Sequence, residues 1–220
     1  MVRRTSLPFA IAAALLALTV SAPIGLAQDA TPNPTWSQED TLRIVKDVQK
    51  KLGGLANYAV FDWITFGIQG KTVILKGYAS RPVLKDEAGR SVKSIPGIDS
   101  VDNQIEVLPL SPSDDRVRAE VYNRIYTQPA LRKYNANAGN LRRATGPGPN
   151  IAAMAGGITQ SPPLGYHAIH IIVKNGNAIL YGVVLNQTDA AIAGVQANSA
   201  FGAFSVDNDL IAQSSASKSK

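Results

Sequence analysis

The two histidines are the side chains best able to bind a metal or to move a proton near neutral pH. His167 and His170 fall in a segment that alternates like a strand, and residues three apart in a strand point to opposite faces. We therefore expect no shared metal ion, with one imidazole packed and the other partly exposed. The chain has no cysteine, which excludes disulfides, thiolate nucleophiles and cysteine-ligated metals.

Two other motifs have the composition of binding sites. The glycine-rich run 146–149 lacks a following Gly-Lys-Ser/Thr, and its prolines remove the amides that would cradle a phosphate. Asp102-Asn103 and Asp207-Asn208 follow predicted helices, where such side chains bond free backbone groups, with ligand binding as the alternative. We find no supported catalytic triad or carboxylate pair. The sequence predicts neither an enzyme nor a cofactor or metal site.

Basic residues gather in two places that could meet anionic lipid headgroups. One cluster lies on a predicted helix and consists of Arg43, Lys46, Lys50 and Lys51. The other lies around a long insertion and consists of Arg132, Lys133, Arg142 and Arg143, with Tyr134 and Leu141 placed for shallow membrane insertion. We favour the insertion cluster as the lipid-binding one. The helix cluster is better explained as the solvated side of a surface helix, whereas the insertion is explained equally well as a flexible loop.

These residues sit on a chain that contains one stretch twice. Landmarks of the first copy recur 105 residues later without a gap. The repeated positions are Gly77, Gly97, Val101 and Asn103 in the first copy, and Gly182, Gly202, Val206 and Asn208 in the second. The spacing indicates a tandem duplication of one small module.

The first copy, residues 38–108, predicts the order helix, strand, strand, helix, strand. A helix with an apolar stripe of Leu42, Val45, Val48 and Leu52 ends at Gly53-Gly54. A strand over 60–68 turns at Gly70 into a second strand that ends near Gly77. Ser80 is expected to cap the second helix, and the third strand runs over 101–108. The predicted class is α+β, with two helices packed on a three-stranded sheet in each module.

The second copy, residues 113–212, follows a linker over 109–113. Val117, Val121 and Ile125 repeat the first helix at an offset of 73, whereas the strands repeat at 105. The difference of 32 residues measures an insertion over about 130–163. Asn175-Gly176 is a hairpin turn, a helix starts at Gln187-Thr188-Asp189, and the last strand covers 205–211.

The N-terminal residues 1–27 have the order of a secretory signal peptide. Arg3 and Arg4 precede an apolar run, and small residues precede a cleavage site between Ala27 and Gln28. An uncleaved anchor is the alternative. The expected location is the periplasm or another exported compartment. Residues 28–37 are a predicted linker and 213–220 a flexible tail.

The repeated motifs resemble the BON domain. The likeness rests on the glycine hairpin around Gly70 and Gly77, on the Pro96-Gly97-Ile98 ending with Val101 and Asn103, and on their counterparts in the second copy. A signal peptide followed by two such modules is similar to periplasmic proteins of the osmotically inducible type. The second copy departs from the pattern through its insertion and through Phe201 in the place of Pro96.

The resemblance implies a non-catalytic protein that attaches to anionic phospholipid membranes and supports envelope integrity or stress tolerance. The alternative is a periplasmic protein–protein adaptor or self-associating scaffold that uses the same surfaces without lipid specificity. Envelope proteins, or the chain itself, are then the partners. The charge of +6, which falls to +4 without Arg3 and Arg4, is too modest to favour nucleic acid in an exported protein.

Overall fold

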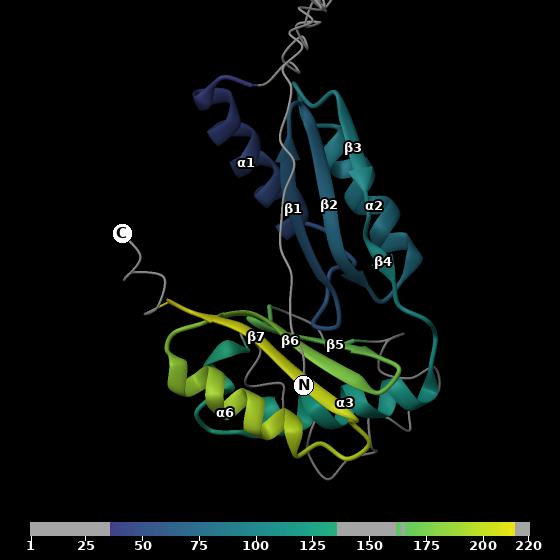
Figure 1. Cartoon of the computed structure of the whole chain (residues 1–220), viewed down its shortest axis with the longest axis vertical. Helices are drawn as coiled ribbons and strands as arrows, with labels where there is room; N and C mark the ends of the chain where they lie inside the picture. The colour runs from purple at the N-terminus through teal and green to yellow at the C-terminus, as the bar shows by residue number, and fades with distance from the viewer. Residues whose placement is uncertain (1–35, 136–161, 164–165, 214–220) are drawn as a thin grey trace, which may run out of the picture. The chain divides into compact units, whose positions relative to one another are not determined.

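The computed structural model describes residues 36–135, 162–163 and 166–213. The described residues form two α+β modules, and both have the predicted order of helix, strand, strand, helix, strand (Figure 1). The predicted signal peptide and cleavage site, most of the linker over 28–37, residues 136–161 of the insertion and the tail from 214 lie outside the described residues. No helix in the described part is long and apolar enough to cross a membrane.

The first module consists of α1 (Gln38–Gly53), β1 (Trp63–Gln69), β2 (Thr72–Ala79), α2 (Pro82–Lys93), β3 (Ser100–Asn103) and β4 (Glu106–Val107). β2 pairs antiparallel with β1 and parallel with β3 and β4. Apolar residues of α1 and α2 pack with Val73 and Leu75 of β2 to form one core, so both helices lie on the same face of the sheet (Figure 1).

Local details of the first module differ from the sequence prediction. Leu42 is 67% exposed, and the buried stripe of α1 consists of Ile44, Val48 and Leu52. Ser80 does not cap α2: the N-cap residue is Arg81, which makes no side-chain capping hydrogen bond, and the Ser80 amide donates to the buried carboxylate of Asp62. The first strand starts at Trp63 rather than at residue 60. The predicted third strand is divided into β3 and β4 around the buried Ile105, whose amide donates to Asn103 Oδ1.

The second module repeats this plan in α3 (Pro112–Thr127), the short 3-10 helix η1 (Arg132–Tyr134), β5 (Ile169–Lys174), β6 (Asn177–Val184), α6 (Gln187–Asn198) and β7 (Ser205–Ala212). Its sheet has the order β5-β6-β7. The register is the same in both modules, because Ile64 faces Gly77 and Ile169 faces Gly182. α3 begins inside the predicted linker, since Ser111 caps it by accepting a hydrogen bond from the Asp114 amide.

The repeated asparagine ties the last strand of each module to its second helix. Asn103 Nδ2 donates to the carbonyl of Lys85 and Asn208 Nδ2 to that of Ala190, both at 2.8 Å. The helix can approach so closely because it carries Gly89 or Gly194 there. A Cβ would lie 2.9 Å or 2.7 Å from the asparagine nitrogen. This contact explains why Asn and Gly recur together.

The repeated glycines Gly77 and Gly182 lie inside β2 and β6, two residues before each strand ends rather than at its junction with the helix. Their φ angles are +119° and +134°, which L side chains rarely adopt. A Cβ at either position would lie 2.0 Å from a backbone oxygen, of Trp63 or Ala168. Both the conformation and the close approach therefore require glycine.

We predict that Gly182→Val lowers the free energy of unfolding by at least about 1 kcal/mol, because the side chain adds strain and a backbone clash. Gly67→Val is the matched control, since a Cβ at Gly67 in β1 meets nothing within 4 Å. Urea denaturation of both variants measures the effect. Equal stability of the two variants contradicts the prediction.

Candidate functional site

The segment between α1 and β1 leaves its own module and completes the core of the other. Val60 and Phe61 are buried in the cluster formed by the second module. The Ile171 amide of β5 donates to the Val60 carbonyl at 2.8 Å, and the Phe61 ring lies 6.3 Å from that of Tyr122. The first module therefore supplies both a backbone acceptor at the edge of β5 and an aromatic side chain of the second core.

A buried carboxylate holds this segment in place. Asp62 accepts hydrogen bonds from the amides of Ala59, at 2.8 Å, and Ser80, at 2.6 Å. Burial raises the pKa of Asp62, although these hydrogen bonds act in the opposite direction. Arg81 supports the same loop, because its Nη2 donates to the Asn57 carbonyl at 2.9 Å. The loop is thus anchored to the start of α2.

Aromatic rings from both modules surround His170. The His170 ring lies 5.2 Å from the rings of Tyr58 and Trp63. Trp63 also stacks on Tyr181 at 5.4 Å with an interplanar angle of 3°, and Tyr78 lies 6.5 Å from Tyr181. These contacts bury His170 between the modules.

The expectation of one packed and one partly exposed histidine is wrong, because His167 and His170 are both buried. His167 Nε2 lies 3.2 Å from the Tyr122 hydroxyl, and His167 forms an isolated bridge with Asn135. The sequence could not reveal this burial, because it comes from residues far away in the chain. No cluster of three metal-ligating His, Cys, Asp or Glu residues occurs within the described ranges.

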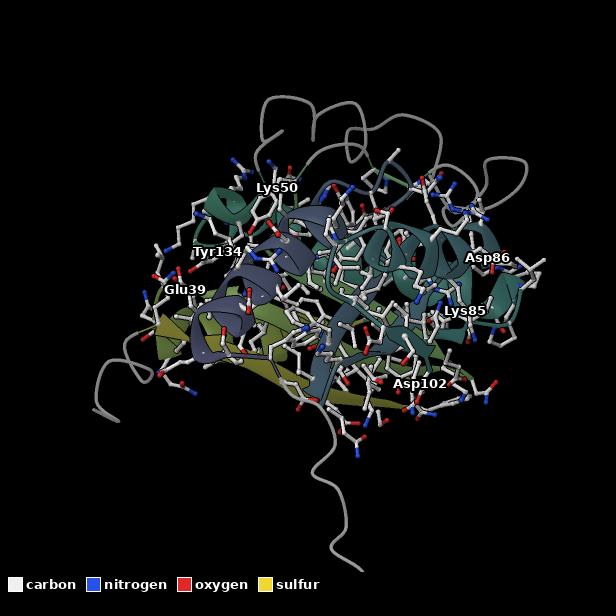
Figure 2. All side chains as sticks on the ribbon, turned by 90° about the horizontal axis from the view of Figure 1, so that it is seen from above. Glu39, Lys50, Lys85, Asp86, Asp102 and Tyr134 are labelled. Carbon is white, nitrogen blue, oxygen red and sulfur yellow. The ribbon has the colours of Figure 1, made fainter. Side chains whose placement is uncertain are left out.

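The basic cluster on α1 is exposed. Arg43 forms ion pairs with Asp40 at 3.4 Å and Asp47 at 3.6 Å on its own helix. Lys46, Lys50 and Lys51 are exposed and take part in none of the ion pairs found in the described residues. Lys50 lies toward the opposite end of α1 from Glu39 (Figure 2). These three lysines remain available to an anionic surface.

The cluster at the insertion has a different environment. Lys133 forms an ion pair with Asp189 at 2.7 Å, and the buried Tyr134 hydroxyl donates to the same carboxylate at 2.5 Å. Burial raises the pKa of Asp189, but hydrogen bonds from Lys133 and its neighbours outweigh it, so the pKa lies below its usual value. Tyr134 is thus not placed for membrane insertion, because its ring packs in the second core. Arg132 is exposed, while Leu141, Arg142 and Arg143 lie outside the described residues.

Among the described residues, the most exposed aromatic side chains belong to the connection between α6 and β7. Phe201 is 88% exposed and Phe204 is 83% exposed, on either side of Gly202. The equivalent residues of the first module are Pro96 and Asp99, so this feature belongs to the second module alone. In the sequence, Phe201 is recognisable because it departs from the repeat. Phe204 was not predicted.

A pocket of about 440 Å³ lies beside these phenylalanines. Arg116 of α3 is exposed and lines this pocket together with Ser111 and Ser113. The pocket's acidic residue, Asp114, already accepts the amides of Asn175 and Gly176 at 3.0 and 2.8 Å. The surface thus combines exposed aromatic rings with a cation, and its buried carboxylate is occupied by backbone donors.

We predict that the chain loses stability on mild acidification because of His170. Burial lowers the pKa of His170 from 6.5 to about 4. As the pH falls from 6.5 to 4, the unfolded chain takes up a proton that the folded chain does not accept, so folding loses about 3 kcal/mol.

Urea denaturation between pH 7.5 and 4 measures this loss, with His170→Gln as the comparison. Subtracting one profile from the other cancels the contributions of the other titrating groups, including Asp62. Profiles that differ only by a constant offset contradict the assignment.

Comparison with known proteins identifies the fold family. The sequence model of the BON domain matches residues 66–109 and 155–213. No curated protein matches the chain. Two solved structures described as CdsD, a structural protein of the type III secretion system of Chlamydia trachomatis, are similar to it.

The first of these structures, a C-terminal domain, is 17% identical, with 80% of this chain and 99% of that chain covered and a TM-score of 0.24. The second is 16% identical, with 79% and 95% covered and a TM-score of 0.24. At this TM-score the likeness carries no information about partners or assembly. The two segments matched by the BON model cover the second helix and the strands of each module, except for the first residues of β1. The two repeated modules therefore belong to the BON domain family.

Proposed function

We propose that the chain is a non-catalytic protein of the cell envelope that attaches peripherally to anionic phospholipid through its second BON domain. The observation that carries this proposal is the exposure of Phe201 and Phe204 on one short connection. Large apolar side chains gathered on a surface mark places where another apolar phase or a partner makes contact. The BON family, which is associated with membranes, supports the lipid as that phase.

A cation beside the phenylalanines favours an anionic membrane. Arg116 lines the adjacent pocket and takes part in none of the ion pairs found between described residues. Each basic residue close to an anionic surface contributes about 1 kcal/mol, within about a Debye length. We infer that Arg116 attracts the surface and that the two phenyl rings then enter the headgroup region.

The apolar contribution exceeds the electrostatic one. Burying one phenylalanine side chain contributes about 1.5–3 kcal/mol. Leu110, which is 76% exposed and precedes the pocket residue Ser111, can add to the same contact. The proposed surface replaces the insertion cluster as the preferred one, because Lys133 is paired and Tyr134 is buried.

Co-sedimentation with anionic and zwitterionic liposomes tests the proposal. The parent chain is expected to prefer anionic liposomes and to lose affinity as salt is added. The double variant Phe201→Ser/Phe204→Ser should bind at least about tenfold more weakly. Arg116→Gln should bind about fivefold more weakly and with a flatter salt dependence.

Leu42→Ser is the control for losing an exposed apolar side chain, since Leu42 lies on the first module. A triple variant in which Lys46, Lys50 and Lys51 are changed to Gln tests whether the basic cluster on α1 binds lipid. If this triple variant loses binding while the phenylalanine variant binds like the parent, the surface is wrongly assigned. Equal binding of the parent to both liposome types contradicts lipid specificity and favours the adaptor function.

A further inference from the structure

The first module has an open groove beside the exposed edge of its sheet. This groove of about 270 Å³ is lined by residues of α1, of the segment between α1 and β1, and of β1, among them Gln49, Leu52, Tyr58, Ile64 and Phe66. The internal repeat of this chain indicates what the groove binds, because the second module has an equivalent site that is filled.

The groove is the counterpart of the site that Phe61 fills in the second module. The helix offset of 73 residues relates Gln49 and Leu52 to Tyr122 and Ile125. The strand offset of 105 residues relates Phe66 to Ile171. In the second module Phe61 lies beside Tyr122, and Val60 accepts the Ile171 amide. The same place in the first module is open.

The backbone edge of the groove is also equivalent. Phe66 faces Leu75 as Ile171 faces Leu180, so the Phe66 amide points away from β2 in the way that the Ile171 amide points away from β6. The Ile171 amide donates to Val60, whereas none of the hydrogen bonds between described residues uses the Phe66 amide in this direction. An unpaired strand edge next to an apolar groove is a place where another extended segment can add.

The second module carries the matching aromatic residue. Tyr166 lies 105 residues after Phe61 and, like it, directly precedes the first strand region of its module. Phe61 is completely buried, but Tyr166 is 71% exposed. The groove and the ring proposed to fill it both differ from their counterparts by a polar group. The groove has Gln49 where the filled site has Tyr122, and Tyr166 has a hydroxyl group that Phe61 lacks.

We propose that the groove of the first module binds Tyr166 of a second copy of this chain. The contact between molecules then repeats the contact that joins the two modules within one molecule. The groove and Tyr166 lie close together on each molecule, because Tyr166 lines a neighbouring pocket with Gly53 and Tyr58, which also line the groove. Two copies can therefore make the contact once, head to tail, or twice, as a reciprocal pair. This inference goes beyond lipid attachment, because neither Phe201 nor Phe204 takes part in it.

The proposed contact is weaker than the one within the chain. Trp63 and Tyr78, which stack on Tyr181 inside the molecule, correspond to Ala168 and Val183 on the donating module. Less aromatic area is therefore buried. The association should depend on concentration, as expected for a small interface.

Sedimentation velocity of the full chain over a concentration series tests the proposal with two complementary variants. Tyr166→Ser removes the inserting ring but keeps the groove. Gln49→Glu places a carboxylate in the groove, where the ring would desolvate it, but keeps the tyrosine. Each variant alone should self-associate at least about tenfold more weakly than the parent, a difference of about 1.4 kcal/mol.

An equimolar mixture of the two variants distinguishes the proposed contact from a general loss of association. It should form dimers at concentrations where each variant is monomeric, because one intact groove meets one intact tyrosine. Growth should stop at the dimer. Phe201→Ser, which changes another exposed aromatic residue of the second module, should associate like the parent.

Three results overturn the proposal: a parent chain that stays monomeric up to millimolar concentration, a Tyr166→Ser variant that associates like the parent, or a mixture that stays monomeric. Gln49 and Tyr166 are both exposed, so the unfolding free energy of either variant should match that of the parent. Measuring it shows that a loss of association does not come from unfolding. Because the readout is mass and no lipid is present, the outcome is independent of the membrane proposal.

Discussion

The insertion of Val60 and Phe61 into the second module is the interaction on which the rest of the structure depends. It supplies the acceptor for the Ile171 amide at the edge of β5 and fills the core beside Tyr122. A buried aromatic residue and a satisfied strand edge both stabilise the second module, which therefore depends on a residue outside its own sequence. Asp62 holds the inserted segment to the corner between β2 and α2.

In the second module, different residues form the hydrogen bonds at the junction between the second strand and the second helix. This difference explains the environment of the insertion. Where the Ser80 amide donates to Asp62, the equivalent Leu185 amide donates to the Tyr134 hydroxyl at 2.8 Å, and His167 occupies the position of Asp62. The start of the insertion thus replaces a buried carboxylate with a buried tyrosine. With its hydroxyl shared between Leu185 and Asp189, Tyr134 has a structural role.

Local sequence periodicity and the repeat predicted the elements and the α+β class, because each module's core is made mainly of its own amphipathic helices and strands. Prediction failed where contacts between distant segments decide the environment. Phe61 alternates like a strand residue but packs in the other module, and His170 looks half-exposed until Tyr58 and Trp63 cover it. Tyr134 looked like an anchor because nothing nearby in the sequence shows that it meets Asp189. The candidate site residues were hard to predict for the same reason. The exposure of Phe204 depends on packing in the folded chain and not on the residues next to it in the sequence.

Native-state amide hydrogen exchange tests most directly whether the two modules form one cooperative structure. The Val60 and Phe61 contacts predict that the slowest-exchanging amides of β2 and of β5, including Ile171, have the same free energy of opening. The reason is that the second core cannot stay folded once the segment that completes it has unfolded. Raising the denaturant concentration should keep the two sets of amides together. Amides of β5 that stay protected after β2 has opened, or an Ile171 amide that exchanges freely while its neighbours in the second core remain closed, would contradict this account.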